Sequence, residues 1–253
     1  MAAAPTSAQS PARSPARSTG ALQIKQLIRR RYARLAGADA FQPDPRATAL
    51  AAGCPTAWYD ALPARAAQAF SGCGWPAGDL DPTGIETIID LGCGGGLDSR
   101  FLAERLNKNA QVVALDLTPE VLDRARETLT GVAGATVRLL AADLEQLPLA
   151  DACADAVIAN AALNLATEAQ AAFAEIARVL RPGGRLVAAD LVRVGALPAE
   201  ILADPMAMAA SLGGVMEEAD LLAVIEDAGL NNVAITGHRP FGPVIAVNIS
   251  ATR

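Results

Sequence analysis

The most restrictive feature of the chain is an apolar run that ends in an acidic residue and leads into closely spaced glycines. Residues 88–98 read Ile-Ile-Asp-Leu-Gly-Cys-Gly-Gly-Gly-Leu-Asp. Glycine permits a sharp turn and a close approach of a ligand to the backbone, and a following helix offers free N–H groups at its N-terminus. The order D-x-G-x-G-x-G puts the carboxylate of Asp90 ahead of Gly92, Gly94 and Gly96, where it would repel a diphosphate and attract an ammonium or sulfonium group. The loop therefore predicts a positively charged ligand.

From Glu86 onward, short apolar runs alternate with helical patterns, which is typical of parallel strands joined by helical crossovers. The predicted parallel strands are 87–91, 111–115, 136–141, 156–159 and 185–189, and the predicted helices are 97–106, 119–129, 168–180 and 217–228. Two closing β runs, 232–236 and 244–250, are separated by a turn too short for a right-handed crossover, so they must pair as an antiparallel hairpin. We predict an α/β fold with a Rossmann-like, doubly wound and mostly parallel sheet.

The N-terminal third of the chain has a different composition. Residues 1–20 contain Ala, Pro, Ser, Thr and Arg without an acidic residue and predict a disordered tail. Residues 21–84 predict a helical arm or cap, with one helix over 21–36 and a short one near 63–70. Residues 85–253 predict the ligand-binding domain, and 191–216 an irregular, lid-like insertion within it.

Composition excludes several classes of function. The 253 residues are 52% hydrophobic and carry a net charge of −6, which argues against a protein that binds nucleic acid. The longest apolar-leaning stretch, 152–166, is too short and too polar to span a membrane, so we expect no membrane partner. Four cysteines without a C-x-x-C pair predict neither a disulfide framework nor a metal site, and they fit a cytoplasmic protein.

Polar residues follow the predicted strands at the points where the strands end. Asp116 follows Asp90 by about one strand-helix unit, the spacing at which a carboxylate accepts hydrogen bonds from a ribose diol. Asp143 ends the third strand, where an adenine amino group could donate to it, and Asn160 follows the fourth strand. Because the carboxyl ends of parallel strands share one edge of the sheet, these side chains should lie in a row.

These motifs, together with Leu180-Arg181-Pro182-Gly183-Gly184 before the fifth strand, resemble the class I S-adenosylmethionine-dependent methyltransferases over residues 85–253. The resemblance implies S-adenosyl-L-methionine as cofactor, with its amino acid end at the glycine loop, its ribose at Asp116 and its adenine at Asp143. The residues that it assigns to the cofactor are Asp90, Gly92, Cys93, Gly94, Gly96, Asp116, Leu117, Asp143, Leu144 and Asn160.

A closer resemblance reaches into the N-terminal arm. The segments similar to landmarks of the arsenite methyltransferases are 30–34, 52–54, 71–74, 160–165, 189–191 and 211–214. Those enzymes hold trivalent arsenic between cysteine thiolates, a pairing of soft ligands with a soft centre. Cys54 and Cys73 match N-terminal cysteines of the family, but Leu163 and Ser211 stand in the regions where two further thiols are expected. The resemblance therefore implies the same scaffold with an altered acceptor site.

We expect a methyltransferase that acts on a small molecule. The acceptor pocket should include Tyr59, Cys73, Leu163 and Ser211, with Trp58, Asn160, Met206 and Met208 nearby. Asn160 and Asp190 are the candidate catalytic residues, and an alcohol or ammonium acceptor would need a general base such as Asp190 or His238. The alternatives are an arsenite methyltransferase that uses Cys54 and Cys73, a lyase or cyclase that uses the same cofactor, and a non-catalytic sensor.

Overall fold

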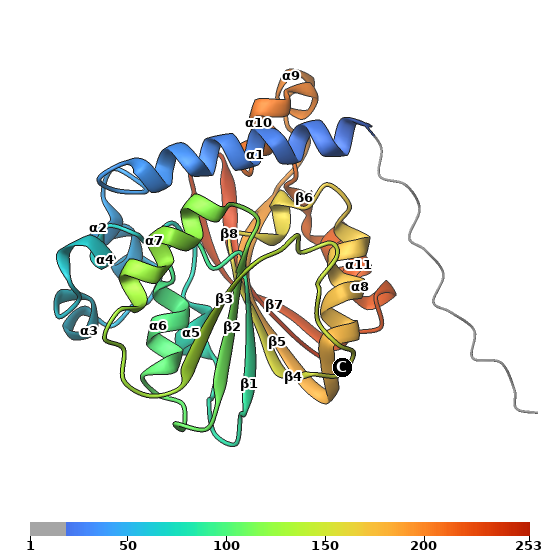
Figure 1. Ribbon diagram of the computed structural model, residues 1–253. Helices are drawn as coiled ribbons and strands as arrows, with labels where there is room; N and C mark the ends of the chain where they lie inside the picture. Colours follow the sequence, from blue (N-terminus) through green and yellow to red (C-terminus); the bar gives the residue numbers. More distant parts are fainter. Residues whose placement is uncertain (1–18) are drawn as a thin grey trace, which may run out of the picture.

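The apolar runs predicted from the sequence form one mixed sheet with helices on both faces (Figure 1). The structure is a computed structural model that describes residues 19–253. Within these residues the strands are β1 (Thr87–Leu91), β2 (Gln111–Asp116), β3 (Thr136–Ala141), β4 (Ala154–Asn160), β5 (Leu180–Arg193), β6 (Met216–Glu217), β7 (Asn231–Phe241) and β8 (Val244–Thr252). Every residue of the central strand β1 is buried, which accounts for its unbroken apolar pattern.

The order of the sheet is β3-β2-β1-β4-β5-β8-β7, and β6 pairs with β5 beside this path. Strands β1 to β5 are parallel, and the chain changes direction across the sheet between β1 and β4. Ligands of such folds bind outside the carboxyl ends of the strands at this switch point. Strand β8 runs antiparallel to both β5 and β7, so the predicted C-terminal hairpin is confirmed.

Alternate residues of β1 enter two different cores. Ile88 packs with Phe101 and Leu102 of α6 (Leu97–Ala103), on the face that α7 (Pro119–Leu129) extends. Ile89 packs on the other face with α8 (Ala169–Val179) and α11 (Glu218–Asp227), whose buried residues include Ile176 and Ile225. The helices of the two faces are visible on opposite sides of the sheet in Figure 1. This division confirms the layered α/β architecture.

The N-terminal arm contains more helices than the sequence predicted. In addition to α1 (Thr19–Gly37) and α4 (Ala64–Ala67), it forms α2 (Pro45–Ala51), α3 (Thr56–Asp60) and α5 (Pro76–Asp79). The three additional helices span only one or two turns, too short for a clear apolar period. The start of α2 is marked by capping residues and not by an apolar period. The Asp44 side chain accepts a hydrogen bond of 2.9 Å from the Ala47 N–H, and Pro45 is the first residue of the helix.

Helix α1 crosses the carboxyl ends of the strands and lies beside α10 (Pro205–Ala209), at the top of the molecule in Figure 1. Its first two residues correct the predicted boundary of the tail at residue 20; residues 1–18 lie outside the described part. No helix among residues 19–253 has the length and hydropathy needed to cross a bilayer.

The predicted insertion over 191–216 is less irregular than expected. Its first residues still belong to β5, which ends at Arg193, because β8 pairs with β5 as far as Val192. The rest contains α9 (Ala199–Ala203) and α10, and it ends at β6. Strand β5 also begins earlier than predicted, directly after α8, so the Pro-Gly-Gly segment lies inside the strand instead of before it.

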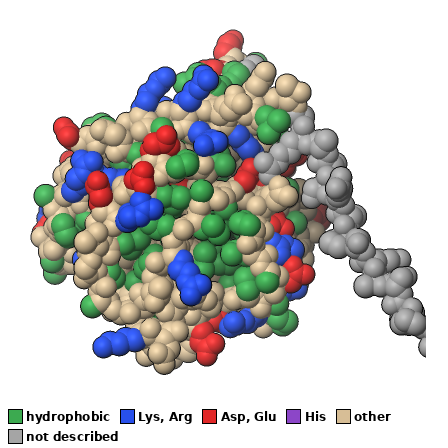
Figure 2. All heavy atoms as spheres, viewed as in Figure 1, with side chains coloured by type: hydrophobic (Ala, Val, Ile, Leu, Met, Phe, Trp, Pro, Cys, Tyr) green, Lys and Arg blue, Asp and Glu red, His purple; other side chains and the backbone are tan. Residues whose placement is uncertain are grey.

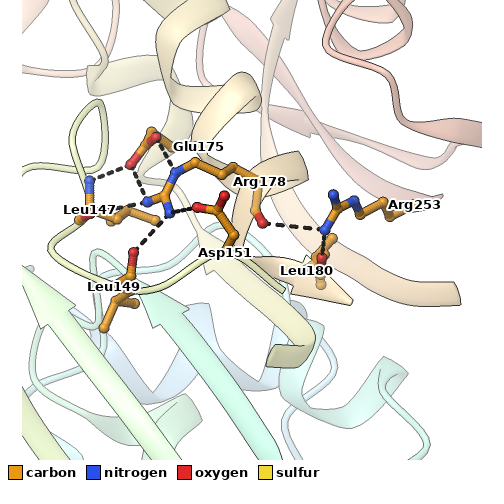
Figure 3. A network of polar contacts seen from close by, with 7 residues as sticks. All are labelled: Leu147, Leu149, Asp151, Glu175, Arg178, Leu180 and Arg253. Atoms are coloured by element: carbon orange, nitrogen blue, oxygen red, sulfur yellow. Dashed lines mark hydrogen bonds and ion pairs between the residues drawn. The ribbon is translucent and has the colours of Figure 1, made fainter. Parts of the chain in front are cut away.

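Arg178 of α8 fixes the loop between β3 and β4, which carries part of the site (Figure 3). Its guanidinium donates to the Leu147 and Leu149 carbonyls and to the carboxylates of Glu175 and Asp151. The hydrogen bond from Arg178 to Glu175 is the main reason why the pKa of this arginine is raised. Glu175 also accepts a hydrogen bond of 2.6 Å from the Leu147 N–H. The loop is therefore held to α8 through both its carbonyls and an amide.

Candidate functional site

Two adjoining cavities lie at the switch point of the sheet. The larger lies over the ends of β2 and β3 and beneath α1. The smaller lies against the glycine loop. Ser71, Gly92 and Asn160 line both, so the two spaces form one elongated site. A site of this shape suits a ligand with a nucleoside at one end and a short polar chain at the other.

The glycine loop adopts a backbone that side chains would obstruct. Gly92, Gly94 and Gly96 all have positive φ values, of 67°, 51° and 82°. A Cβ at Gly92 would lie 2.5 Å from the Cβ of Ala162. Gly92 and Gly94 line the smaller cavity together with Cys93, whereas Gly96 lines neither cavity and starts α6. The predicted loop is thus brought to the site, with Gly96 supporting the turn.

Two carboxylates are buried at the smaller cavity. Asp90 accepts a hydrogen bond of 2.5 Å from Ser99 Oγ, and Asp98 accepts one of 3.1 Å from Asn160 Nδ2. Burial raises the pKa of Asp90 to about 8, and the nearby negative charge of Asp98 adds to this rise. Burial also raises the pKa of Asp98 to about 6. The hydrogen bonds at this end of the site do not fully stabilise both carboxylates as anions. A cationic ligand would therefore be stabilised there.

Asp116 lines the larger cavity at the end of β2, as the sequence predicts. Its two oxygens accept hydrogen bonds from the Gly94 N–H at 3.2 Å and the Thr118 N–H at 2.9 Å. Burial raises the pKa of Asp116 to about 6 despite these hydrogen bonds. Leu117 lines the same cavity beside it. The carboxylate is thus held in one orientation with its remaining lone pairs available to a donor in the cavity.

The adenine end predicted at Asp143 is also an ion-pair site. Asp143 and Leu144 line the larger cavity, together with Glu145. Lys25 of α1 reaches down to this loop, and its Nζ lies 2.6 Å from Asp143 Oδ2 and contacts the Glu145 carboxylate. Lys25, which is distant in the sequence, therefore already donates a hydrogen bond to the Asp143 carboxylate that the sequence predicts to bind the adenine.

Asn160 joins the N-terminal arm to the sheet. Its Oδ1 accepts hydrogen bonds from the N–H groups of Cys73 and Gly74 at 2.9 and 3.2 Å, and its Nδ2 donates to the Gly74 carbonyl and to Asp98. A Cβ at Gly72 would lie 2.3 Å from Asn160 Nδ2, so this arm segment passes directly against the carboxamide. Asn160 lines both cavities, but its polar atoms are occupied in positioning neighbouring groups.

The structure places neither candidate base in the cavities. The buried Asp190 carboxylate accepts hydrogen bonds from the backbone N–H groups of Leu163, Asn164 and Leu191, at 2.7, 3.2 and 2.8 Å. Asp190 therefore caps η1 (Leu163–Leu165) and lines neither cavity. His238 lies on β7, where it contacts the exposed Glu218 at 2.6 Å.

The predicted acceptor residues are likewise displaced from the cavities. Tyr59 is buried in the arm, where its hydroxyl donates to the Ala67 carbonyl, and Leu163 packs in the main core. Neither residue lines one of the two cavities. Ser211 lines neither cavity, and its carbonyl accepts a hydrogen bond of 3.1 Å from Asn164 Nδ2. Met206 is 47% exposed, and the Met208 side chain lies outside the described part of the structure.

The two arm cysteines belong to different apolar clusters. Cys54 packs with Ala49, Tyr59 and Trp75, whereas Cys73 packs among residues of β5 and β8. Burial raises the pKa of Cys54 to about 12 and that of Cys73 well above its ordinary value. Both thiols are therefore protonated at neutral pH. Among residues 19–253, no group of three or more His, Cys, Asp or Glu side chains is arranged to hold a metal ion.

Several residues that line the cavities were not assigned by the sequence analysis. Asp98 stands at the end of the glycine motif, so its position after Gly96 was an available signal. Ser71 lies in the segment 71–74 and Tyr32 in the segment 30–34, both of which are similar to the arsenite family. Lys25 and Tyr32 are brought to the site by α1, where their spacing with Ile28 puts all three on one helical face.

Comparison with known proteins agrees with this geometry. The family model described as a methyltransferase domain matches residues 84–229. An arsenite methyltransferase from Halobacterium salinarum is 34% identical over 164 residues, which cover 65% of this chain and 42% of that protein. A malonyl-[acyl-carrier protein] O-methyltransferase from Hahella chejuensis is 39% identical over 110 residues, which cover 42% of this chain and 37% of that protein. The matched segments thus span less than half of either relative.

Among solved structures, a similar fold is that of CrArsM, an arsenic (III) S-adenosylmethionine methyltransferase from Chlamydomonas reinhardtii. The TM-score is 0.63 with 23% sequence identity, and the match covers 83% of this chain and 73% of that chain. The similarity extends the common fold beyond the segment matched by the family model. From the family match, which covers more than half of the chain, we conclude that the chain belongs to the methyltransferase domain family.

Proposed function

We propose that this protein transfers the methyl group of S-adenosylmethionine to a small organic acceptor, on a scaffold of the arsenite methyltransferase type whose acceptor side has changed. The observation that carries the cofactor assignment is the set of buried carboxylates along one continuous site. The observation that carries the acceptor assignment is the separation of Cys54 and Cys73 into two apolar clusters.

The charge of the site fits this cofactor. Asp90, Asp98 and Asp116 have raised pKa values because burial penalises their anionic forms. A ligand with an ammonium and a sulfonium group would offset that penalty, whereas a diphosphate would increase it. We assign the amino acid end to the smaller cavity, the ribose to Asp116 and the adenine to Asp143 and Leu144 in the larger one. The residues at the strand ends orient the ligand and exclude water.

When bound, the cofactor supplies an electrophilic methyl group that a nucleophile attacks in line. The chain itself offers no evident base for that nucleophile among the described residues that line the cavities, since the acids face the cationic ligand. Burial raises the pKa of the Tyr32 phenol, which keeps it protonated and able to donate a hydrogen bond. We therefore infer an acceptor that reacts through a lone pair of its own, such as a thiolate or an enolate-like carbon.

Arsenite is the second candidate, favoured by the identity with the halobacterial enzyme. Trivalent arsenic requires thiolates that converge on one point. The buried, protonated thiols of Cys54 and Cys73 and the residues Leu163 and Ser211 do not supply such a set. If arsenite were nevertheless the acceptor, the arm would have to rearrange to bring the two thiols together.

Two measurements test the proposal. Titration calorimetry should show binding of S-adenosylmethionine and S-adenosylhomocysteine, and either ligand should raise the melting temperature, as a ligand of the folded state does. No binding at millimolar ligand would contradict the cofactor site. The protein is then incubated with labelled cofactor and either a panel of thiols and carbon acids or arsenite with glutathione. We expect a methylated organic product and S-adenosylhomocysteine, with turnover retained when Cys54 and Cys73 are both replaced by serine.

Efficient formation of methylarsenic, lost in the double serine variant, would instead support the arsenite assignment. Conversion of the cofactor skeleton without methyl transfer would identify a lyase or cyclase. Binding without turnover of any kind would indicate a sensor.

A further inference from the structure

Lys25 differs from the other cationic residues of α1. Its side chain is 8% exposed, whereas Arg29, Arg30, Arg31 and Arg34 are exposed to solvent. Figure 2 shows Lys and Arg side chains standing out along the upper edge of the molecule, where α1 lies in Figure 1. Burying an ammonium group is costly unless it is paired and hydrogen-bonded. The contacts with Asp143 and Glu145 therefore offset the cost of burying the Lys25 ammonium group beneath α1.

Those partners are fixed independently of Lys25. Glu145 Oε1 accepts hydrogen bonds from the Thr167 N–H and Oγ1 at 2.7 and 2.8 Å, and from the Glu168 N–H at 3.3 Å. The opposite oxygen, Oε2, contacts Lys25 Nζ. The same loop is held a few residues later by Arg178, as Figure 3 shows. Lys25 thus ties the surface helix α1 to an anchored loop.

A second contact holds α1 at another point along its length. Helix α1 packs against α10, and Tyr32 lies near Ser211, which follows α10. Lys25, Ile28 and Tyr32 are spaced three and four residues apart, and all three line the larger cavity. Helix α1 therefore forms the roof of that cavity.

The Lys25 contact competes with the ligand expected beneath this roof. Asp143 Oδ1 accepts a hydrogen bond of 3.0 Å from the Glu145 N–H, and Asp143 Oδ2 accepts one from Lys25. An adenine amino group directed at Asp143 must share or displace the Lys25 hydrogen bond. Glu145 would keep Lys25 in place in either case, because its carboxylate is also held by Thr167 and by the Glu168 N–H.

We propose that Lys25 is a positioning residue that latches α1 over the nucleoside end of the bound cofactor. In this latch, Lys25 stays paired with Glu145 and gives up Asp143 to the adenine amino group. The latch slows cofactor release, since α1 must lift before the nucleoside can leave. This inference rests on the proposed cofactor site.

The first test is the dissociation rate of S-adenosylhomocysteine, measured by stopped-flow competition. Lys25→Met removes the charge, Lys25→Arg retains it, and Lys108→Met is the matched control on an exposed lysine far from the site. We expect dissociation at least tenfold faster in Lys25→Met, partial recovery in Lys25→Arg and no change in Lys108→Met. A lower melting temperature with an unchanged dissociation rate would show a merely structural role and overturn the latch.

The second test needs no variant. Lys25 and Lys108 are the two lysines of the chain, so acetylation by a mild amine reagent can be followed at both by mass spectrometry. S-adenosylhomocysteine should slow the reaction of Lys25 about tenfold or more and leave Lys108 unaffected. Ligand binding without protection of Lys25 would refute the latch alone. Failure of the wild-type protein to bind the ligand would contradict the proposed function as well.

Discussion

Binding of the cofactor should release protons, because its amino acid end enters a site whose carboxyl groups are partly protonated. Burial raises the pKa of Asp90 to about 8, with Asp98 adding to the rise, so at pH 7 Asp90 carries ~0.9 proton in the free protein. A ligand ammonium favours the ionised form and expels that proton. The dissociation constant of S-adenosylhomocysteine should therefore decrease roughly ninefold from pH 6 to 7 and roughly fivefold from pH 7 to 8.

The assay is titration calorimetry at several pH values, in buffers of different ionisation enthalpy, which yields both affinity and protons released. Asp90→Asn keeps the size of the side chain and removes the titration, so its affinity should be lower at pH 8 and nearly independent of pH across this window. Asp123→Asn, on the exposed face of α7, is the matched control and should behave as wild type. A wild-type affinity that does not change between pH 6 and 8, with no proton release, would refute the assignment of Asp90 to a cationic group.

Three further outcomes follow from the same geometry. Without ligand, the folded protein binds more protons than the unfolded chain between about pH 4 and 8, because the pKa values of Asp90 and Asp116 are raised. The free energy of unfolding, measured by urea titration, should therefore fall as pH rises through this window. A free energy of unfolding that rises with pH would contradict the burial of these acids. Asp116→Asn should weaken S-adenosylhomocysteine by about 1.5–3 kcal/mol in calorimetry, since it removes a charge-assisted hydrogen bond, and an unchanged affinity would exclude a ribose contact. Gly92→Ala should lower the melting temperature more than Gly131→Ala. Both glycines have positive φ, so both variants carry backbone strain of about 1–3 kcal/mol, but only the Cβ added at Gly92 would clash with a neighbour. Equal losses of melting temperature would show that the clash is relieved.

The parts of the fold that were predictable are those governed by period and by chain connectivity. The buried runs at β1 and β2, the crossover helices and the short connection between β7 and β8 all leave local patterns. The additional short helices α2, α3 and α5 of the arm do not, because one or two turns are too short to show an apolar repeat. The length of β5 could not be predicted either, since its extension to Arg193 depends on β8, which comes much later in the sequence.

The site divides in the same way. Asp90, Asp116 and Asp143 were predictable because each ends a strand, and the sheet brings strand ends together. Asp190 also follows a predicted strand, 185–189, yet its carboxylate caps η1 instead of lining a cavity. No local signal distinguishes an acid that lines the site from one that caps a helix. Lys25 reaches the site from a helix more than a hundred residues away in the chain, as its contact with Asp143 shows. Long-range packing of this kind leaves no trace in a single sequence.

Asn160 has a practical consequence for redesign of the enzyme. Its carboxamide forms hydrogen bonds with the backbone of Cys73 and Gly74 and with Asp98. One side chain therefore connects the N-terminal arm to the smaller cavity. Randomising residues near Gly72 to broaden the range of acceptors would disturb the cofactor at the same time. Mutant libraries aimed at new acceptors should leave Asn160 and its partners intact and vary the stretch around α10, none of whose described residues lines either cavity.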